Sequence, residues 1–266
     1  MRWVLNTYQT AQDWDVPTLC RIAAEAGYEG IEFLQDFHQA HGLEADATPA
    51  HRHEVRQALA AQGLACASLT SCMRFDMADD AERARSVQQV RRVIDYALEL
   101  DCTHVRVLGD RVPEDPAERA MVIDRVARSL RTLGEDAATR GIIVSMEVHG
   151  GFTDPEPARA VVEAVGLPNV GLVFNSQWRI GATTGWALPA GAPSIRPLHD
   201  LIGRHCTSVH THQMEKPAEL GYYRELFQLL RADGFTGFIS NECAYRGPDP
   251  ERVLRMYTAL FRALTA

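Results

Sequence analysis

The sequence predicts a single α/β domain, a (β/α)8 TIM barrel over residues 1–266. Short apolar runs alternate with longer amphipathic segments from one end of the chain to the other, which is typical of a parallel sheet. No strand-strand hairpin is evident, and 266 residues match the roughly 250 residues that one such barrel needs. Eight parallel strands can close on themselves and leave no exposed sheet edge.

The apolar runs give eight strand candidates at regular intervals. An open, doubly wound sheet is the alternative arrangement, but the G-x-G-x-x-G that often follows its first strand is missing here. We therefore favour the closed barrel. The candidates are, in order, WVLNTY, GIEFL, ACASLT, HVRVLG, IIVSMEV, VGLVF, TSVHTH and GFISNE.

The segments between these runs carry apolar residues three and four positions apart, which places one apolar stripe along a helix. Asp115-Pro116 and Asp154-Pro155 are typical of helix starts, since Asp caps the first turn and Pro fits its first position. Glycines follow several of these segments, where a left-handed residue ends a helix. The clearest helix candidates are 15–26, 50–61, 81–100 and 116–139.

A long irregular stretch from Ser176 to Ile195 is rich in Gly, Ala, Thr and Pro. Loops of this length in compact domains are usually functional or disordered. Because the stretch follows a strand end, where barrel enzymes place their sites, we expect a loop that covers the substrate.

Composition narrows the class of partner. A net charge of −8 disfavours nonspecific binding to nucleic acid or to an anionic membrane. No stretch approaches the roughly 20 apolar residues of a membrane span. The six cysteines are scattered without a C-x-x-C pair, and the N-terminus lacks the pattern of a signal peptide. We therefore expect reduced thiols, a cytoplasmic protein and no structural zinc site.

Four polar residues stand at the ends of the last four strand candidates: Glu147, Asn175, His210 and Glu242. The carboxyl ends of parallel strands open into a shared mouth, so these side chains should converge. Oxygen and imidazole groups arranged in this way are typical ligands of a catalytic divalent metal.

The motifs E-x-H at the fifth strand and H-x-H-Q at the seventh resemble the xylose isomerase-like TIM barrel superfamily, with its sugar phosphate isomerases and epimerases. The resemblance extends over essentially the whole chain. It implies a divalent metal, Mn²⁺, Mg²⁺, Co²⁺ or Zn²⁺, held by Glu147, Asn175, His210 and Glu242. The family has Asp where this chain has Asn175, and often a histidine where it has Trp178.

The uncharged Asn175 removes one negative charge from the ligand set, so metal binding should be weakened or lost. With a metal bound, Glu147 and Glu242 would be the catalytic pair. Proton transfer through an enediolate would make the protein an isomerase or epimerase of a small sugar, ketose or keto-polyol. A lyase or dehydratase acting on an oxidised sugar or glycoside, and a metal-free binding barrel, remain open.

The same superfamily contains endonuclease IV-type enzymes. That branch would require additional histidines at the third and fourth strand ends, which here read SLTSC and RVLGD. With the acidic net charge, this argues against a nucleic-acid substrate. Related barrels often form dimers or tetramers, so a homo-oligomer is possible.

Five residues are candidates for binding the substrate. His149 and His212 lie two positions beyond Glu147 and His210, on the same strand faces. Arg106 is a charge at a strand end and should contact either substrate or Glu147. Tyr8, Phe33, Trp178 and Trp186 are candidates for an apolar wall. The substrate candidates are thus His149, His212, Arg106, Trp178 and Glu32.

Two further features receive a structural interpretation. His38 and His41, near Asp36, fall in a predicted loop without strand-end geometry, and we expect this loop to be solvated. Gly150-Gly151 fits a tight turn as well as it fits a phosphate cradle.

Overall fold

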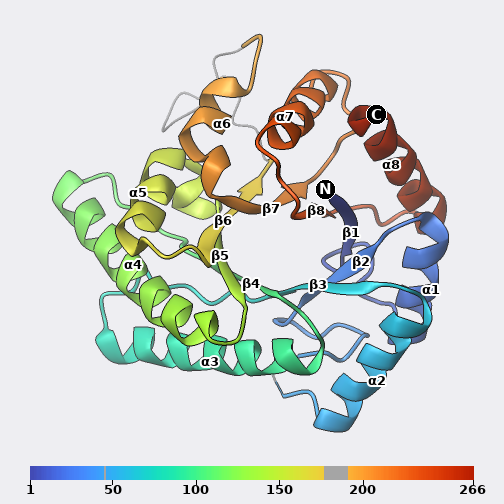
Figure 1. Ribbon diagram of the computed structural model, residues 1–266, viewed down its shortest axis with the longest axis horizontal. Coiled ribbons are helices and arrows are strands. Elements are labelled where there is room, and N and C mark those ends of the chain that lie inside the picture. Colours follow the sequence, from blue (N-terminus) through green and yellow to red (C-terminus); the bar gives the residue numbers. More distant parts are fainter. Residues whose placement is uncertain (45, 177–190) are drawn as a thin grey trace.

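The computed structural model of the protein describes residues 1–44, 46–176 and 191–266. In this part of the chain the strands form a closed parallel barrel in sequence order, which confirms the predicted fold class (Figure 1). The strands are β1 (Arg2–Asn6), β2 (Gly30–Leu34), β3 (Ala65–Thr70), β4 (His104–Leu108), β5 (Ile143–Glu147), β6 (Val170–Asn175), β7 (Cys206–Thr211) and β8 (Phe238–Asn241).

Helices surround the barrel and cover the outer face of the strands (Figure 1). The two expected caps are present, since Asp115 and Asp154 cap their helices. Asp15 is a further cap and accepts a hydrogen bond from the Thr18 N–H at 3.0 Å. Short 3-10 helices cover Gly150–Thr153 and Gly203–His205. The α-helices are α1 (Val16–Ala26), α2 (Pro49–Ala61), α3 (Asp80–Glu99), α4 (Pro116–Ala138), α5 (Pro155–Val165), α6 (Arg196–Ile202), α7 (Leu220–Ala232) and α8 (Pro250–Thr265).

The barrel closes where β1 pairs with β8, from Arg2 opposite Phe238 to Leu5 opposite Asn241. Buried Trp3 secures this seam. Its indole N–H donates to Thr258 Oγ1 at 3.0 Å, and its ring stacks on Phe261 with centroids 4.4 Å apart. The first strand and the last helix therefore share one packed junction.

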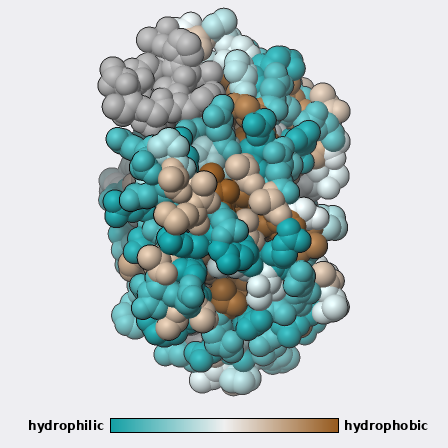
Figure 2. All heavy atoms as spheres, turned by 90° about the vertical axis from the view of Figure 1, so that its left-hand side faces the viewer, coloured by the Kyte–Doolittle hydropathy of each residue, from teal (hydrophilic) through white to brown (hydrophobic). Residues whose placement is uncertain are grey.

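The surface on one side of the barrel is largely polar. On the side shown in Figure 2, hydrophilic residues predominate and apolar residues form small groups between them. Within the described residues, no helix is long and apolar enough to cross a membrane.

The loop between β2 and α2 differs from the prediction, because His41 is fully buried rather than solvated. Its Nδ1 accepts a hydrogen bond from the Leu43 N–H at 3.0 Å, and its ring packs edge-on against Phe33. His38 remains exposed. The sequence pattern did not indicate this burial, since one aromatic contact and one local hydrogen bond produce it.

Acid should destabilise the fold through His41. Burial lowers the pKa of His41 from 6.5 to about 4, and protonation would break the bond from Leu43. Between pH 6.5 and about pH 4, His41 is protonated in the unfolded chain and neutral in the folded chain. The free energy of unfolding should therefore fall as the pH is lowered through this window, by at most about 3 kcal/mol for this group.

Urea unfolding across that pH window tests this expectation. His41→Asn keeps an acceptor for Leu43 and should show a shallower loss of stability toward low pH. Exposed His53 provides the matched control, and His53→Gln should follow the wild type. Equal pH slopes for wild type and His41→Asn would contradict the assignment.

Candidate active site

The carboxyl ends of β5 to β8 bring the four strand-end residues to one end of the barrel. Glu147 and Asn175 are the last residues of β5 and β6. His210 lies in β7 directly opposite Asn175. Glu242 follows β8, where its N–H donates to the Thr211 carbonyl at 2.9 Å. Strand register alone therefore assembles this cluster.

Three of the four residues form a group that could hold a metal ion. One ligand atom each from Glu147, His210 and Glu242 lies within 4.8 Å of the others. His210 Nδ1 is 3.6 Å from Glu147 Oε1 and 3.4 Å from Glu242 Oε2. This buried nitrogen has no hydrogen-bond partner among the described residues. Two carboxylates and one imidazole are ligands that a divalent ion accepts.

Asn175 lies beside this group and is engaged by its neighbours. Its Nδ2 donates to Glu147 Oε1 at 2.5 Å, and its Oδ1 lies 2.8 Å from His212 Nε2. His212 Nε2 is in turn 3.5 Å from Glu242 Oε2. The amide thus connects the two acidic sides of the site. A carboxylate in its place would bring a second negative charge against Glu147.

Arg106 pairs with Glu147, one of the two possibilities that the sequence left open. Its Nε lies 3.0 Å from Glu147 Oε2, and its Nη1 donates to the Ser71 carbonyl at 3.0 Å. Burial alone would raise the pKa of Glu147. The charges of Arg106 and His210, together with the Asn175 amide, outweigh burial and hold that pKa far below its usual range.

Glu32 lies beneath His210 rather than beside the cavity. Its Oε1 is 2.8 Å from His210 Nε2 and accepts a hydrogen bond from Asn6 Nδ2 at 2.9 Å. Glu32 is the middle residue of β2, so its side chain sits one layer below the strand end. Burial lowers the pKa of His210, but the Glu32 and Glu147 carboxylates outweigh it and raise that pKa well above its usual value.

Comparison with known proteins agrees with this architecture. The family model described as xylose isomerase-like TIM barrel matches residues 20–262. The chain belongs to this family.

Relatives of this xylose isomerase-like barrel differ in their chemistry. A region of 186 residues is 27% identical to the Homo sapiens putative hydroxypyruvate isomerase and covers 63% of this chain, but only 64% of that relative's length. The E. coli 3-keto-D-glucoside 4-epimerase superimposes with a TM-score of 0.75 at 19% identity over 99% of both chains. A xylose isomerase-like barrel from Mycobacterium smegmatis, in complex with magnesium, gives 0.67 at 21% identity over 94% of this chain and 88% of its own.

At these identities the two solved structures show a shared fold and nothing finer. Whether an ion would fit depends on the side-chain oxygen and nitrogen atoms of this chain. His210 Nδ1 faces two carboxylates at ligand-like separations, so Glu147, His210 and Glu242 fit a divalent ion. The Asn175 oxygen lies 2.8 Å from His212 Nε2.

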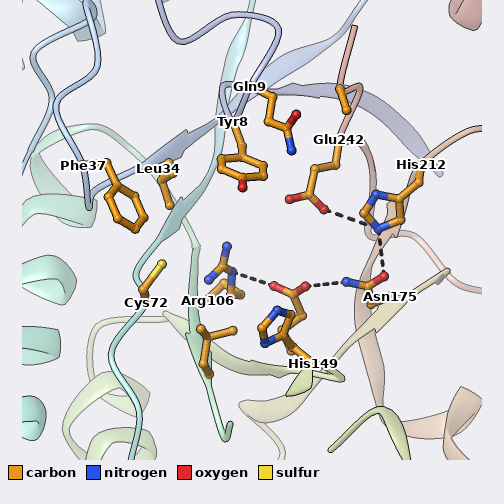
Figure 3. Close-up of a pocket in the computed structure, with 13 residues that line it drawn as sticks. Tyr8, Gln9, Leu34, Phe37, Cys72, Arg106, His149, Asn175, His212 and Glu242 are labelled. Carbon is orange, nitrogen blue, oxygen red and sulfur yellow. Dashed lines mark hydrogen bonds and ion pairs between the residues drawn. The ribbon is translucent and has the colours of Figure 1, made fainter. Parts of the chain in front are cut away.

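A cavity of about 350 Å³ opens above the cluster in this xylose isomerase-like barrel. Figure 3 shows Glu242, His212 and Asn175 connected in a row beside it, and Glu147 joins Asn175 to Arg106. His149 also lines the cavity, and its Nδ1 lies 3.4 Å from Asp110 Oδ1. Four of the five substrate candidates therefore have a known position, and Trp178 lies outside the described residues.

The turn after His149 holds this histidine at the cavity. Gly150 adopts a left-handed φ of 58°, and the Gly151 N–H donates to the Asp110 carbonyl at 2.7 Å. An added side chain at Gly150 would meet that carbonyl. The tight-turn interpretation of the glycine pair therefore accounts for these contacts.

The apolar wall has a different composition from the one predicted. Tyr8 lines the cavity, as expected, but Phe33 is fully buried in the core. Trp186, like Trp178, belongs to the residues that are not described. Sequence reasoning missed Phe37, which lines the cavity and is 69% exposed. Its neighbourhood, LQDFHQAHG, follows a strand end, and that position could have suggested it.

Proposed function

We propose that this protein is a metal-dependent isomerase or epimerase acting on a small sugar, ketose or keto-polyol. One observation carries the proposal: two carboxylates and a buried imidazole converge at the floor of a sugar-sized cavity. The names of the relatives, an isomerase and an epimerase, support the same reaction class.

In this proposal Glu147 and Glu242 exchange a proton with the carbon beside the substrate carbonyl. A divalent ion held by Glu147, His210 and Glu242 would supply electrophilic stabilisation of the enediolate oxygen. Arg106 and Asn175 keep Glu147 ionised and fix its orientation. Glu242 contacts the two histidines at 3.4 and 3.5 Å.

The residues at the cavity mouth would orient the substrate. His149 and His212 present ring nitrogens to sugar hydroxyls, and Glu32 fixes the His210 ring through its Nε2. A proton returned to the opposite face of the same carbon gives epimerisation. A proton returned to the neighbouring carbon gives isomerisation, and loss of a β-leaving group gives elimination.

Solvent exchange tests the reaction class without knowledge of the product. The protein is incubated in D₂O with Mn²⁺ or Mg²⁺ and a panel of ketoses, keto-glycosides and hydroxypyruvate. Proton NMR should show loss of a carbon-bound proton next to the carbonyl of at least one compound, and chelation should abolish it. Exchange that persists after chelation would refute the metal dependence, and no exchange on any compound would refute the reaction class.

A metal-free barrel is the second candidate, and the contacts of Glu147 favour it. Both Glu147 oxygens already have partners, Arg106 on one and Asn175 on the other. Together with His210, Arg106 provides cationic compensation for the buried carboxylates. A site neutralised in this way has less need for an ion.

Asn175→Asp tests whether residue 175 belongs to the metal site. The added charge repels Glu147 and favours a divalent ion between them, so affinity for Mn²⁺ should rise by about 10–100-fold, of the order seen when the surroundings of a metal site change. Titration calorimetry measures this affinity directly. Gln57→Glu adds the same charge on exposed α2 and should leave the affinity unchanged. Similar Mn²⁺ affinities in Asn175→Asp and the wild type would argue against the four-residue site.

A further inference from the structure

The cavity is divided into a polar side and an apolar side. Figure 3 shows Glu242, His212 and Asn175 on one side, and Leu34, Phe37 and Cys72 on the other, with Arg106 between them. The polar side comes from the later strands and the apolar side from the ends of β2 and β3. A ligand that fills this cavity therefore meets two different chemical environments.

Phe37 is the unusual member of the apolar side. Its φ is 65°, in the left-handed region that large side chains rarely adopt. Its side chain is 69% exposed, so its ring gains little from burial in the core. A strained backbone beneath an exposed aromatic ring is a combination that folding alone does not favour.

The chain on both sides of Phe37 is firmly anchored. The Asp36 carboxylate accepts a hydrogen bond from the Cys72 N–H, and Gln35 Nε2 donates to the Leu43 carbonyl at 2.6 Å. The Gln39 N–H donates to Glu44 Oε1 at 2.9 Å. These contacts hold the left-handed residue and its ring at the cavity edge.

A second strained residue lines the same cavity. Gln9 has a φ of 61° and lies beside Tyr8 in the loop after β1, where both face the cavity (Figure 3). Tyr8 is 38% exposed and adds another aromatic ring above the floor. Two left-handed residues on neighbouring loops point to a surface shaped for a ligand.

We propose that the apolar side, formed by Leu34, Phe37 and Cys72, together with the neighbouring Tyr8 ring, binds an aryl or bulky alkyl substituent carried by the sugar. The preferred ligand is then a sugar glycoside with an apolar aglycone, whose hydroxyls face the histidines. A plain sugar would place hydroxyls against Leu34 and Phe37, where they lose water without gaining a partner. The inference rests on the proposed function for the identity of the sugar part.

Binding of unreactive glycosides tests this without catalysis. Phenyl β-D-glucoside and methyl β-D-glucoside are titrated into the protein by calorimetry. The phenyl compound should bind at least about tenfold more tightly, because it buries its ring against the apolar side. Equal affinities, or no measurable binding of either glycoside, would overturn the proposal.

Phe37→Gly tests whether the phenylalanine at this strained position serves ligand binding or stability. Glycine adopts this backbone conformation freely, so the variant should unfold at the same temperature or a higher one. Its preference for the phenyl glucoside should shrink to about twofold. Met121→Ala, which removes an apolar side chain that is 49% exposed on α4, should keep the full preference.

Two results for Phe37→Gly would contradict the inference. A lower unfolding temperature with an unchanged preference would assign the ring to stability, and an altered oligomeric mass would assign it to contact between copies. If the protein prefers the phenyl glucoside but shows no solvent exchange, the aryl-binding inference holds and only the proposed reaction is contradicted. If it shows solvent exchange without a preference for the phenyl glucoside, the proposed reaction holds and the aryl-binding inference is contradicted.

Discussion

Glu242→Gln is expected to lower turnover of any accepted keto-sugar by about 10²–10⁴-fold, the contribution of one acid–base group. The amide keeps the size of the side chain but cannot accept a proton from carbon. Glu147→Gln should be comparably inactive, since the proposed reaction needs a carboxylate on each side of the substrate. Steady-state assays and solvent exchange measure both losses.

The two glutamates should differ in their effects on the protein itself. Glu242 lies at the cavity floor beside His210 and His212, and it has no ion pair with arginine among the described residues. Glu242→Gln should therefore lose less stability than Glu147→Gln. Glu147→Gln leaves Arg106 without its buried counter-charge and should be less stable. Turnover within a factor of three of the wild type in both variants would exclude the proposed acid–base pair.

Arg106→Met should lower the free energy of unfolding by about 3–5 kcal/mol, because it removes the arginine that pairs with the buried Glu147 charge and leaves only His210 to compensate it. Burial lowers the pKa of Arg106, but the Glu147 and Glu32 carboxylates outweigh burial and raise that pKa above its usual value. The guanidinium therefore stays charged. Urea unfolding measures the change. Arg21→Met removes a half-exposed arginine that pairs with Glu25 on the surface and should cost less than about 1 kcal/mol.

A double substitution separates charge from packing in this pair. Arg106→Met combined with Glu147→Gln removes both charges, so it should recover most of the stability that Arg106→Met loses. Added Mn²⁺ should also stabilise Arg106→Met more than the wild type, since an ion can replace the missing cation. A double variant as unstable as the sum of both single changes would show that the ion pair itself contributes little.

The barrel and its polar cluster could be predicted because periodicity and strand order determine them. Alternation of apolar runs with helical segments defined the strands, and each strand end supplied one member of the cluster. Glu147, Asn175, His210 and Glu242 meet because parallel strands in sequence order place consecutive ends side by side. No long-range information beyond the order of the strands was needed.

The remaining features depend on distances that periodicity does not encode. Glu32 and Leu34 are two residues apart on β2, yet one supports His210 from below and the other lines the cavity. Whether Arg106 would contact Glu147 or a substrate depended on the spacing between β4 and β5. Phe37 could not be predicted, because a left-handed backbone is usually indicated by glycine and this position has phenylalanine.

The seam between β1 and β8 has a consequence for how the chain folds during synthesis. While the ribosome is still making the second half of the protein, β1 can pair with β2 but lacks its other neighbour. Trp3 likewise has to wait for Thr258 and Phe261 in α8. Contacts of such high sequence separation form late. The nascent barrel should therefore keep an open edge that chaperones can bind, and it should gain protease resistance only after α8 has been made and has packed against β1.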